Sequence, residues 1–253
     1  MADIQQFKGF ELPTAHDVPI WRYMSLEKFE ALLQSQSLYF AAATQFDDHF
    51  EGAISKVDHR ERLARTAAIN PDLVKYDPGV SSAFKQLRRL TKINCWHMNE
   101  HESDAMWRLY TATGQGIAVR STIRRLTESL SDYYAENAKM PETIWLGAVR
   151  YVDYNTAKIP DDLMLGRFFC KRLSFAHERE LRAAVSLRMA EEFGVRVPEN
   201  GIEVRVSLGS LVEAVYVAPK APQSVVDAVR KLLAANGLKV SVRQSALDDP
   251  ALY

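Results

Sequence analysis

The 253-residue sequence has few cysteines, no long hydrophobic run and no excess of charge of either sign. Its two cysteines, Cys95 and Cys170, lie far apart in the chain, which argues against a disulfide scaffold and favours a reducing compartment. No apolar run approaches the roughly 18 residues that a membrane span needs. The start, MADIQQFKGF, lacks the charged and apolar regions of a signal peptide. We therefore predict a cytoplasmic protein with no membrane partner.

Lysine plus arginine and aspartate plus glutamate each total 32 residues, so the formal net charge is zero. The field of the whole protein would not steer it to nucleic acid or to an anionic membrane. A nucleic-acid partner would need a local basic face, and residues 56–92 carry cations for one: Arg60, Arg62, Arg65, Lys85, Arg88, Arg89 and Lys92. The same side chains suit the solvated faces of two helices, and the sequence leaves both interpretations open.

Strand and helix patterns alternate along the chain. Strands are predicted over residues 20–24, 38–41, 117–121, 145–154, 175–185, 202–208, 215–218 and 239–244. Helices are predicted over residues 26–33, 56–69, 80–91, 102–110 (stopped by Gly114 and Gly116), 122–134, 161–173 and 224–236. We predict an α+β fold: a single domain, residues 1–253, with a mixed, mainly antiparallel (split) sheet flanked by helices and a helical insert around residues 56–91. A C-terminal βαβ-like part, residues 200–246, is expected to complete the same sheet.

Residues 92–110, KINCWHMNEHESDAMWRLY, form a strand pattern that leads through a polar turn into a helix. Ser103, Trp107 and Tyr110 lie at helical spacing on one face, which is typical of a core stripe and also suits a pocket wall. Glu102 and Ser103 fall in the first turn, where free N–H groups favour an anion or a simple cap. Cys95, His97 and His101 have spacing that zinc sites use, but no fourth ligand stands at a diagnostic separation, so we expect no metal. A lone histidine on a strand is more often a hydrogen-bonded structural residue.

An acidic loop precedes the helical insert. The sequence TQFDDHFEG, residues 44–52, places Asp47, Asp48 and Glu51 around two phenylalanines. The phenylalanines would anchor a loop whose acids face a cleft or water. A turn with capping aspartates fits the same pattern, and both interpretations stay open.

Two further sites carry isolated or paired charges. Arg22 lies in a strand pattern between Trp21 and Tyr23, where its guanidinium would hold an anion such as a pyrophosphate or pair with an acid. Glu178 and Glu180 alternate in a strand pattern, which would point both carboxylates to one face. Such a pair can raise a pKa and steady a developing positive charge, or it can form salt bridges with neighbouring cations such as Lys171.

The motifs together resemble a bacterial family, domain of unknown function 2971, over about residues 20–187. The resemblance rests on W-R-Y at 21–23, F-D-D-x-F-E-G at 46–52, C-W-H-x-N-E-x-E-S-x-x-M-W-x-x-Y at 95–110, G-x-G-I-A at 114–118 and K-x-x-x-F-x-H-E-x-E-x-R at 171–182. That family label names no reaction.

A more distant resemblance is to the ADP-ribosyltransferase fold, whose members grip NAD with a split sheet. The order of elements is similar: Arg22 early, Trp96 with Ser103 in the middle, and late Glu178-x-Glu180, which is similar to the E-x-E of arginine-type transferases. The middle element departs from the family patterns, because it has neither a Ser-Thr-Ser strand nor a plain His-Tyr pair.

The resemblance implies NAD as co-substrate and cleavage of its nicotinamide glycosidic bond. Glu180 would stabilise the oxocarbenium-like ribose, and Glu178 would orient or deprotonate the acceptor, a protein or a nucleic acid. Arg22 would hold the pyrophosphate. Pocket residues would be Tyr23, Trp96, Glu102, Ser103, Trp107, Tyr110 and Lys171.

Two other functions stay open at this point. The acids Asp47, Asp48, Glu51, Glu178 and Glu180, with Lys171 on the phosphate, would suit a magnesium-dependent phosphodiesterase or nuclease. A non-catalytic module that binds a nucleotide or a protein through residues 96–110 would need none of this chemistry.

Overall fold

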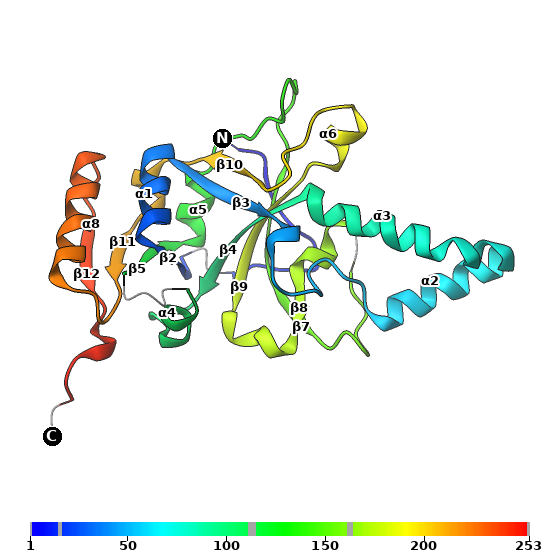
Figure 1. Cartoon of the computed structure of the whole chain (residues 1–253), viewed down its shortest axis with the longest axis horizontal. Coiled ribbons are helices and arrows are strands. Elements are labelled where there is room, and N and C mark those ends of the chain that lie inside the picture. Colours follow the sequence, from blue (N-terminus) through cyan, green and yellow to red (C-terminus); the bar gives the residue numbers. More distant parts are fainter. Residues whose placement is uncertain (1, 15–16, 111–114, 161–163, 252–253) are drawn as a thin grey trace.

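The computed structural model describes residues 2–14, 17–110, 115–160 and 164–251. Its main sheet runs in the order β1-β6-β9-β4-β2-β5-β11-β12, and β3 and β10 join it beside β4 (Figure 1). The bounds are β1 Ile4–Gln6, β2 Pro19–Ser25, β3 Ser37–Ala42, β4 Thr91–Met98, β5 Gly116–Thr122, β6 Ile144–Ala148, β9 Glu180–Ser186, β10 Gly201–Arg205, β11 Ala214–Val217 and β12 Ser241–Gln244. A second, two-stranded sheet pairs β7 (Arg150–Val152) with β8 (Cys170–Arg172).

The sheet splits at β4. Along one edge β4 pairs antiparallel with β9 from Thr91 to His97. Along the other edge its two ends pair with different strands, because β2 meets His97 and Met98 whereas β3 meets Lys92 and Ile93. A fork between β2 and β3 therefore opens at residues 94–96. The pairs β1–β6 and β11–β12 are parallel, and the pairs around the fork are antiparallel, which confirms the predicted mixed, mainly antiparallel sheet.

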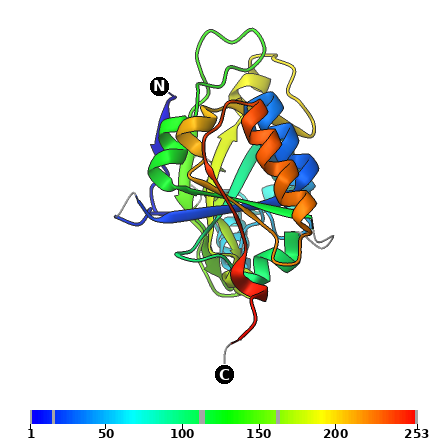
Figure 2. The same ribbon diagram turned by 90° about the vertical axis from the view of Figure 1, so that its left-hand side faces the viewer.

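Apolar side chains cover both faces of the sheet. One face packs into the larger core with α1 (Leu26–Ser35), α5 (Ile123–Ser129) and α8 (Gln223–Ala235). Figure 2 shows α1 and α8 lying side by side on this face, where the two helices also contact each other. A smaller core on the other face is rich in phenylalanine, including Phe168 and Phe169. Among the described residues no helix is both long and apolar enough to cross a membrane.

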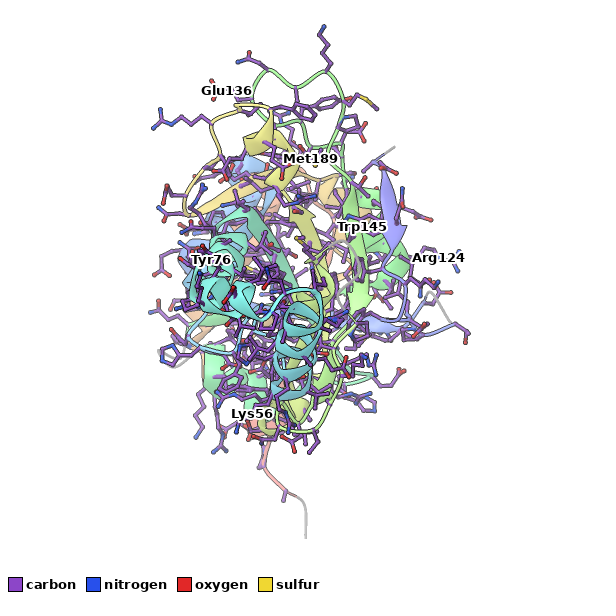
Figure 3. The ribbon with its side chains drawn as sticks, turned by 90° about the vertical axis from the view of Figure 1, so that its right-hand side faces the viewer. Lys56, Tyr76, Arg124, Glu136, Trp145 and Met189 are labelled. Carbon is purple, nitrogen blue, oxygen red and sulfur yellow. The ribbon has the colours of Figure 1, made fainter. Side chains whose placement is uncertain are left out.

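The predicted helical insert is an arm that projects from the sheet (Figure 1). It consists of α2 (Lys56–Ile69), a short 3₁₀ segment (Pro71–Tyr76) and α3 (Asp77–Leu90). Ser55 begins α2 by accepting a hydrogen bond from the backbone N–H of Asp58 at 3.0 Å. Figure 3 views the molecule from the tip of this arm, with Lys56 and Tyr76 labelled.

Remaining short helices are α4 (Asp104–Tyr110), α6 (Arg188–Glu192) and α7 (Leu208–Leu211), with 3₁₀ turns at Ala43–Gln45, Gly166–Phe169, Leu173–Glu178 and Ala246–Asp248. The predicted stop at Gly114 lies outside the described residues, and Gly116 begins β5. Among the C-terminal strands, β10 pairs with β3, and β11 pairs with β5 and β12.

Several predicted boundaries are wrong for local reasons. α3 begins at Asp77 rather than residue 80, because Pro78 fits the first helical turn. α5 ends at Ser129 rather than near residue 134, because Leu130 and Tyr133 form bridges with Val206 and Glu142 instead. The strand predicted over residues 145–154 is broken into β6 and β7.

The helix predicted over residues 161–173 is also wrong where the structure describes it. Residues 164–173 contain a 3₁₀ turn and β8, while 161–163 lie outside the described residues. Phe168, Phe169 and Cys170 are all at most 1% exposed. Three consecutive buried side chains do not fit the one-sided face of a surface helix. The strand predicted to begin at residue 175 begins only at Glu180, because Leu173–Glu178 is a 3₁₀ turn and Arg179 is left-handed, with φ of 42°.

Candidate functional site

Five charged side chains form a buried chain of ion pairs, here called the acid–base chain: Glu51, Arg182, Glu180, Lys171 and Glu178. Arg182 donates to Glu51 through two nitrogens, at 2.6 and 3.0 Å, and through Nε to Glu180 Oε2 at 2.6 Å. Lys171 Nζ lies 2.6 Å from Glu180 Oε1 and also donates to Glu178 Oε2. Side-chain exposure is 8% or less for all five.

Separate elements deliver these side chains. Glu180 and Arg182 alternate on one face of β9, Lys171 comes from β8, and Glu51 comes from the acidic loop. Glu178 ends a 3₁₀ turn and does not share a strand with Glu180, so the strand argument for their common direction was wrong. The left-handed residue between them turns the backbone so that both carboxylates still meet at Lys171.

The two acids of the pair have opposite electrostatic character. Burial, followed by the adjacent Glu180 carboxyl, raises the pKa of Glu178 to about 7. Burial also opposes the charge of Glu180, but Arg182, Glu178 and Lys171 together outweigh it and hold the pKa of Glu180 well below its usual range. Near neutral pH, Glu180 is therefore ionised and Glu178 can gain or lose a proton, as a general base requires.

Arg22 lies on β2 at the fork. Its Nη2 donates to the carbonyl oxygen of Tyr39 at 3.4 Å, and its guanidinium carbon is 6.0 Å from the centre of the Trp96 ring. Its Nη1 is buried and has no hydrogen-bond partner among the described residues. Burial lowers the pKa of Arg22 to about 10, which still leaves it charged at neutral pH. An arginine with an unpaired buried N–H can donate it to an anionic ligand.

Trp96 points to the opposite face of the sheet from the acid pair. In the antiparallel register Trp96 is opposite Leu181, whereas His97 is opposite Glu180. Trp96 is 2% exposed within the larger core, and its Nε1 donates to Asn94 Oδ1 at 2.7 Å. The structure therefore brings Trp96 to Arg22 but not to Glu180.

Four of the expected pocket residues hold α4 against β2. The Tyr23 hydroxyl accepts a hydrogen bond from the backbone N–H of Ser103 at 2.8 Å, and its ring meets Trp107 edge-on at 5.0 Å. Trp107 is 3% exposed and donates from Nε1 to Glu102 at 2.9 Å. These contacts anchor the helix, with Ser103 Oγ near the N–H of Met106 at 3.5 Å as a weak cap.

Tyr110 ends α4 and is half exposed, at 50%. Burial, followed by the carboxylates of Glu178 and Glu180 and the Cys95 thiol, raises the pKa of Tyr110. The phenol is therefore neutral near pH 7 and accessible to a ligand.

His97 supports the acid pair through a partner that the sequence did not indicate. Its Nδ1 lies 2.6 Å from the carbonyl oxygen of Glu178, which can only accept, so Nδ1 carries the proton. Burial lowers the pKa of His97 and keeps it neutral. The sequence left two roles open for this residue, a zinc ligand and a hydrogen-bonded structural histidine, and its observed contact is of the second kind. Its strand partner, Glu180, follows from the register of β4 and β9 and not from any local motif.

The acidic loop does not act as one cluster. Glu51 belongs to the acid–base chain, so it faces neither a cleft nor water, contrary to expectation. Asp48 pairs with Arg172 at 2.8 Å and caps the N–H of Phe50 at 3.0 Å, whereas Asp47 is exposed. In the part of the chain that the structure describes, no group of three or more His, Cys, Asp or Glu side chains is placed to hold a metal ion.

Two surface cavities lie away from this region. One, of 440 Å³, is lined by residues 9–11 and 148–150, and the other, of 560 Å³, lies at the start of α2. Neither includes Arg22, Tyr110 or the acid pair. The candidate site therefore coincides with neither of these two cavities.

No family model matches the chain, and no curated protein does. The resemblance to domain of unknown function 2971 therefore stays a prediction.

Solved structures of DarT from Thermus sp. 2.9 are weakly similar to the chain. The complex with NAD+ has 8% sequence identity and a TM-score of 0.41, covering 92% of this chain and 98% of that chain. The complex with ADP-ribosylated ssDNA has 9% identity and a TM-score of 0.41, covering 91% and 95%. The complex with carba-NAD+ has 9% identity and a TM-score of 0.40, covering 91% and 97%. Identities and scores this low transfer neither a fold nor an activity to this chain.

Proposed function

We propose that this protein is an ADP-ribosyltransferase-like enzyme that binds NAD at the fork of its sheet and cleaves the bond between nicotinamide and ribose. One observation carries the proposal: of the two strands beside β4, β2 holds Arg22, whose buried Nη1 has no hydrogen-bond partner among the described residues, and β9 with the turn before it holds the buried carboxylate pair, Glu178 and Glu180. An anion-binding group and a carboxylate pair in one region of the sheet are what this cleavage requires.

The chemistry follows from charge. The bond breaks with its electron pair moving to nicotinamide, which loses its positive charge and leaves, while positive charge develops on the ribose. A fixed carboxylate in a dry site stabilises that charge more than water would, because the protein groups are already oriented. Arg22 would hold the pyrophosphate of NAD, and Tyr110 would line the site. The acceptor of the ADP-ribosyl group, a protein, a nucleic acid or water, stays open.

The magnesium-dependent alternative gains no support from these contacts. Both oxygens of Glu51 bind Arg182, and the two oxygens of Glu180 bind Arg182 and Lys171, one each. Asp48 binds Arg172. Lys171 likewise forms ion pairs with two acids, so its ammonium group is not placed to bind a phosphate. A non-catalytic nucleotide-binding module remains the competing function, and it differs from the proposal in one respect, turnover.

Incubation with NAD+ separates these possibilities. Nicotinamide release is measured by chromatography, and NAD+ binding by calorimetry, for the wild type and for a variant that combines Glu178→Gln with Glu180→Gln. The expected result is binding by both proteins and release by the wild type alone. Glu203→Gln is the matched control, because Glu203 is exposed on β10. Binding without release would favour the module, and neither binding nor release would contradict the proposal.

A further inference from the structure

The two carboxylates of the acid pair use their oxygens differently. Glu180 is fully engaged: Oε1 lies 2.6 Å from Lys171 Nζ, and Oε2 lies 2.6 Å from Arg182 Nε. Its backbone N–H also donates to the Tyr151 hydroxyl at 2.8 Å. Glu178 binds Lys171 through Oε2, and its carboxyl also interacts with that of Glu180. Among the described residues none donates to Glu178 Oε1, so within the pair Glu178 alone has an oxygen that no protein cation or N–H holds.

The charge of the acid–base chain points to the same residue. When all five members are ionised, the three carboxylates outnumber the two cations by one. Glu51 is held by two nitrogens of Arg182, and Glu180 lies between Arg182 and Lys171. The surplus negative charge therefore falls on Glu178, at the end of the chain. A proton or a positively charged ligand group would complete the balance there.

We propose that Glu178, and not Glu180, is the carboxylate that contacts the ribose of NAD, and that Glu180 is a positioning residue that acts through Lys171. This assignment rests on the proposed function and reverses the roles that the sequence resemblance implied. As the nicotinamide bond breaks, Glu178 faces the positive charge that develops on the ribose. The acceptor, which is water in a hydrolysis assay, then forms the new bond to that carbon and loses a proton to solvent.

The reverse assignment would need a buried ion pair to break. For Glu180 to contact a ligand, it would have to release Lys171 or Arg182, whose side chains are 8% and 0% exposed. Such a release leaves a buried cation without its partner, which is strongly unfavourable. Glu178 needs no such change, because its Oε1 is already free of protein donors among the described residues.

Single substitutions test the assignment. Nicotinamide release is measured between about pH 5 and 9 for the wild type, Glu178→Gln, Glu180→Gln and the control Glu203→Gln, with NAD+ affinity and unfolding temperature recorded for each. Glutamine at position 180 leaves Lys171 and Arg182 one carboxylate each, so this variant is expected to fold. We expect Glu178→Gln to bind NAD+ and to lose roughly 100- to 10,000-fold in kcat at every pH.

The pH profile separates a positioning role from a merely structural one. In the wild type, kcat should rise with pH as Glu178 loses its proton near neutrality. In Glu180→Gln, turnover should persist, and its midpoint should move to lower pH because Lys171 then pairs with Glu178 alone. The assignment would be overturned if Glu178→Gln released nicotinamide at the wild-type rate. It would also be overturned if a folded Glu180→Gln were inactive while Glu178→Gln stayed active.

Failure of the proposed function gives a different result. In that case even the wild type neither binds nor cleaves NAD+. The carboxylate assignment is then read from a carbon-13 NMR titration of the glutamate side chains. If one carboxyl signal titrates near neutral pH in the wild type and is missing in Glu178→Gln, Glu178 remains the available carboxylate. If the wild type has no such signal, the assignment of Glu178 is overturned as well.

Discussion

The acid–base chain and the helical arm contain the same kinds of charged residue in opposite surroundings. Arg182 is 0% exposed and binds two carboxylates. Arg62 on α2 pairs with Asp77 of α3 at 2.8 Å, with side chains 18% and 20% exposed, and α2 has no buried residue in its length. Water can replace the partners of Arg62 but not those of Arg182. Burial, rather than residue type, makes one group a candidate site and the other a solvated face.

The two regions also differ in what their ion pairs do to the charged groups. In the arm, ion pairs hold α2 against α3 at partly exposed positions. In the acid–base chain, the same pairing fixes Glu180 in its ionised form and raises the pKa of Glu178 to about 7. Pairs of acids whose surroundings push their pKa values apart are the arrangement used for acid and base roles.

The largest expected effect comes from breaking the buried pairs. Arg182→Ala leaves Glu51 and Glu180 buried without their shared cation, which should lower the free energy of unfolding by about 3–5 kcal/mol. Urea denaturation of the purified protein measures this loss. A loss no greater than that of a surface variant would mean that water reaches the chain.

A smaller effect is expected at the fork. Arg22→Met removes the partly buried guanidinium that we assign to the pyrophosphate, so the dissociation constant for NAD+ should rise by roughly 10- to 100-fold, the range of a charge-assisted contact. Calorimetry measures the constant. Unfolding temperature serves as the control, and an unchanged affinity in a folded variant would remove Arg22 from the site.

The pH dependence of stability sharpens the contrast between the two acids. Glu178 has an ordinary pKa of 4.5 when unfolded and about 7 when folded, so the folded state binds more protons between these values. Stability contributed by this group is present below about pH 4.5 and is lost as pH rises through about 7. After allowance for solvent screening, the loss amounts to about 1–2 kcal/mol.

Glu178→Gln should abolish this decline. Unfolding free energies of the wild type and the variant, measured by urea denaturation between about pH 5 and 8, should therefore converge at high pH or cross in favour of the variant. His97 acts in the opposite direction, because its lowered pKa contributes stability that grows with pH. The comparison of two proteins that share His97 removes its contribution. Parallel curves would contradict the raised pKa of Glu178.

The smallest effect is expected in the arm. Arg62→Ala breaks a partly exposed pair, so it should lower the free energy of unfolding by about 1 kcal/mol or less. Nicotinamide release should be unchanged, since Arg62 lies on α2, away from the fork. A loss comparable with that of Arg182→Ala would erase the difference between the two regions.

Local patterns sufficed for much of the fold. Alternation of apolar and polar residues identified β2, and helix patterns identified the arm. The structure of residues 164–178 could not be predicted from local patterns. Consecutive side chains such as Phe168 and Phe169 are buried together there, which matches neither a helical nor a strand period. Tertiary packing decided that segment.

The site was predictable by residue type but not by geometry. Glu178 and Glu180 stood out as a pair in the sequence. Glu51 joins them by binding Arg182, from which it is separated by 131 positions in the chain. Trp96 stood out as an aromatic, yet the register of β4 turns it away from the acids and turns His97 toward them. A shift of one residue exchanges the two faces of a strand, and only the paired strands fix it.

The most direct test of the account is the ratio of nicotinamide release by Glu178→Gln to that by the wild type, with NAD+ in excess and both proteins folded. The account predicts release by the wild type and a rate lower by roughly 100-fold or more in the variant, at similar NAD+ affinity. Equal rates in the two proteins, or no release by the wild type, would contradict it.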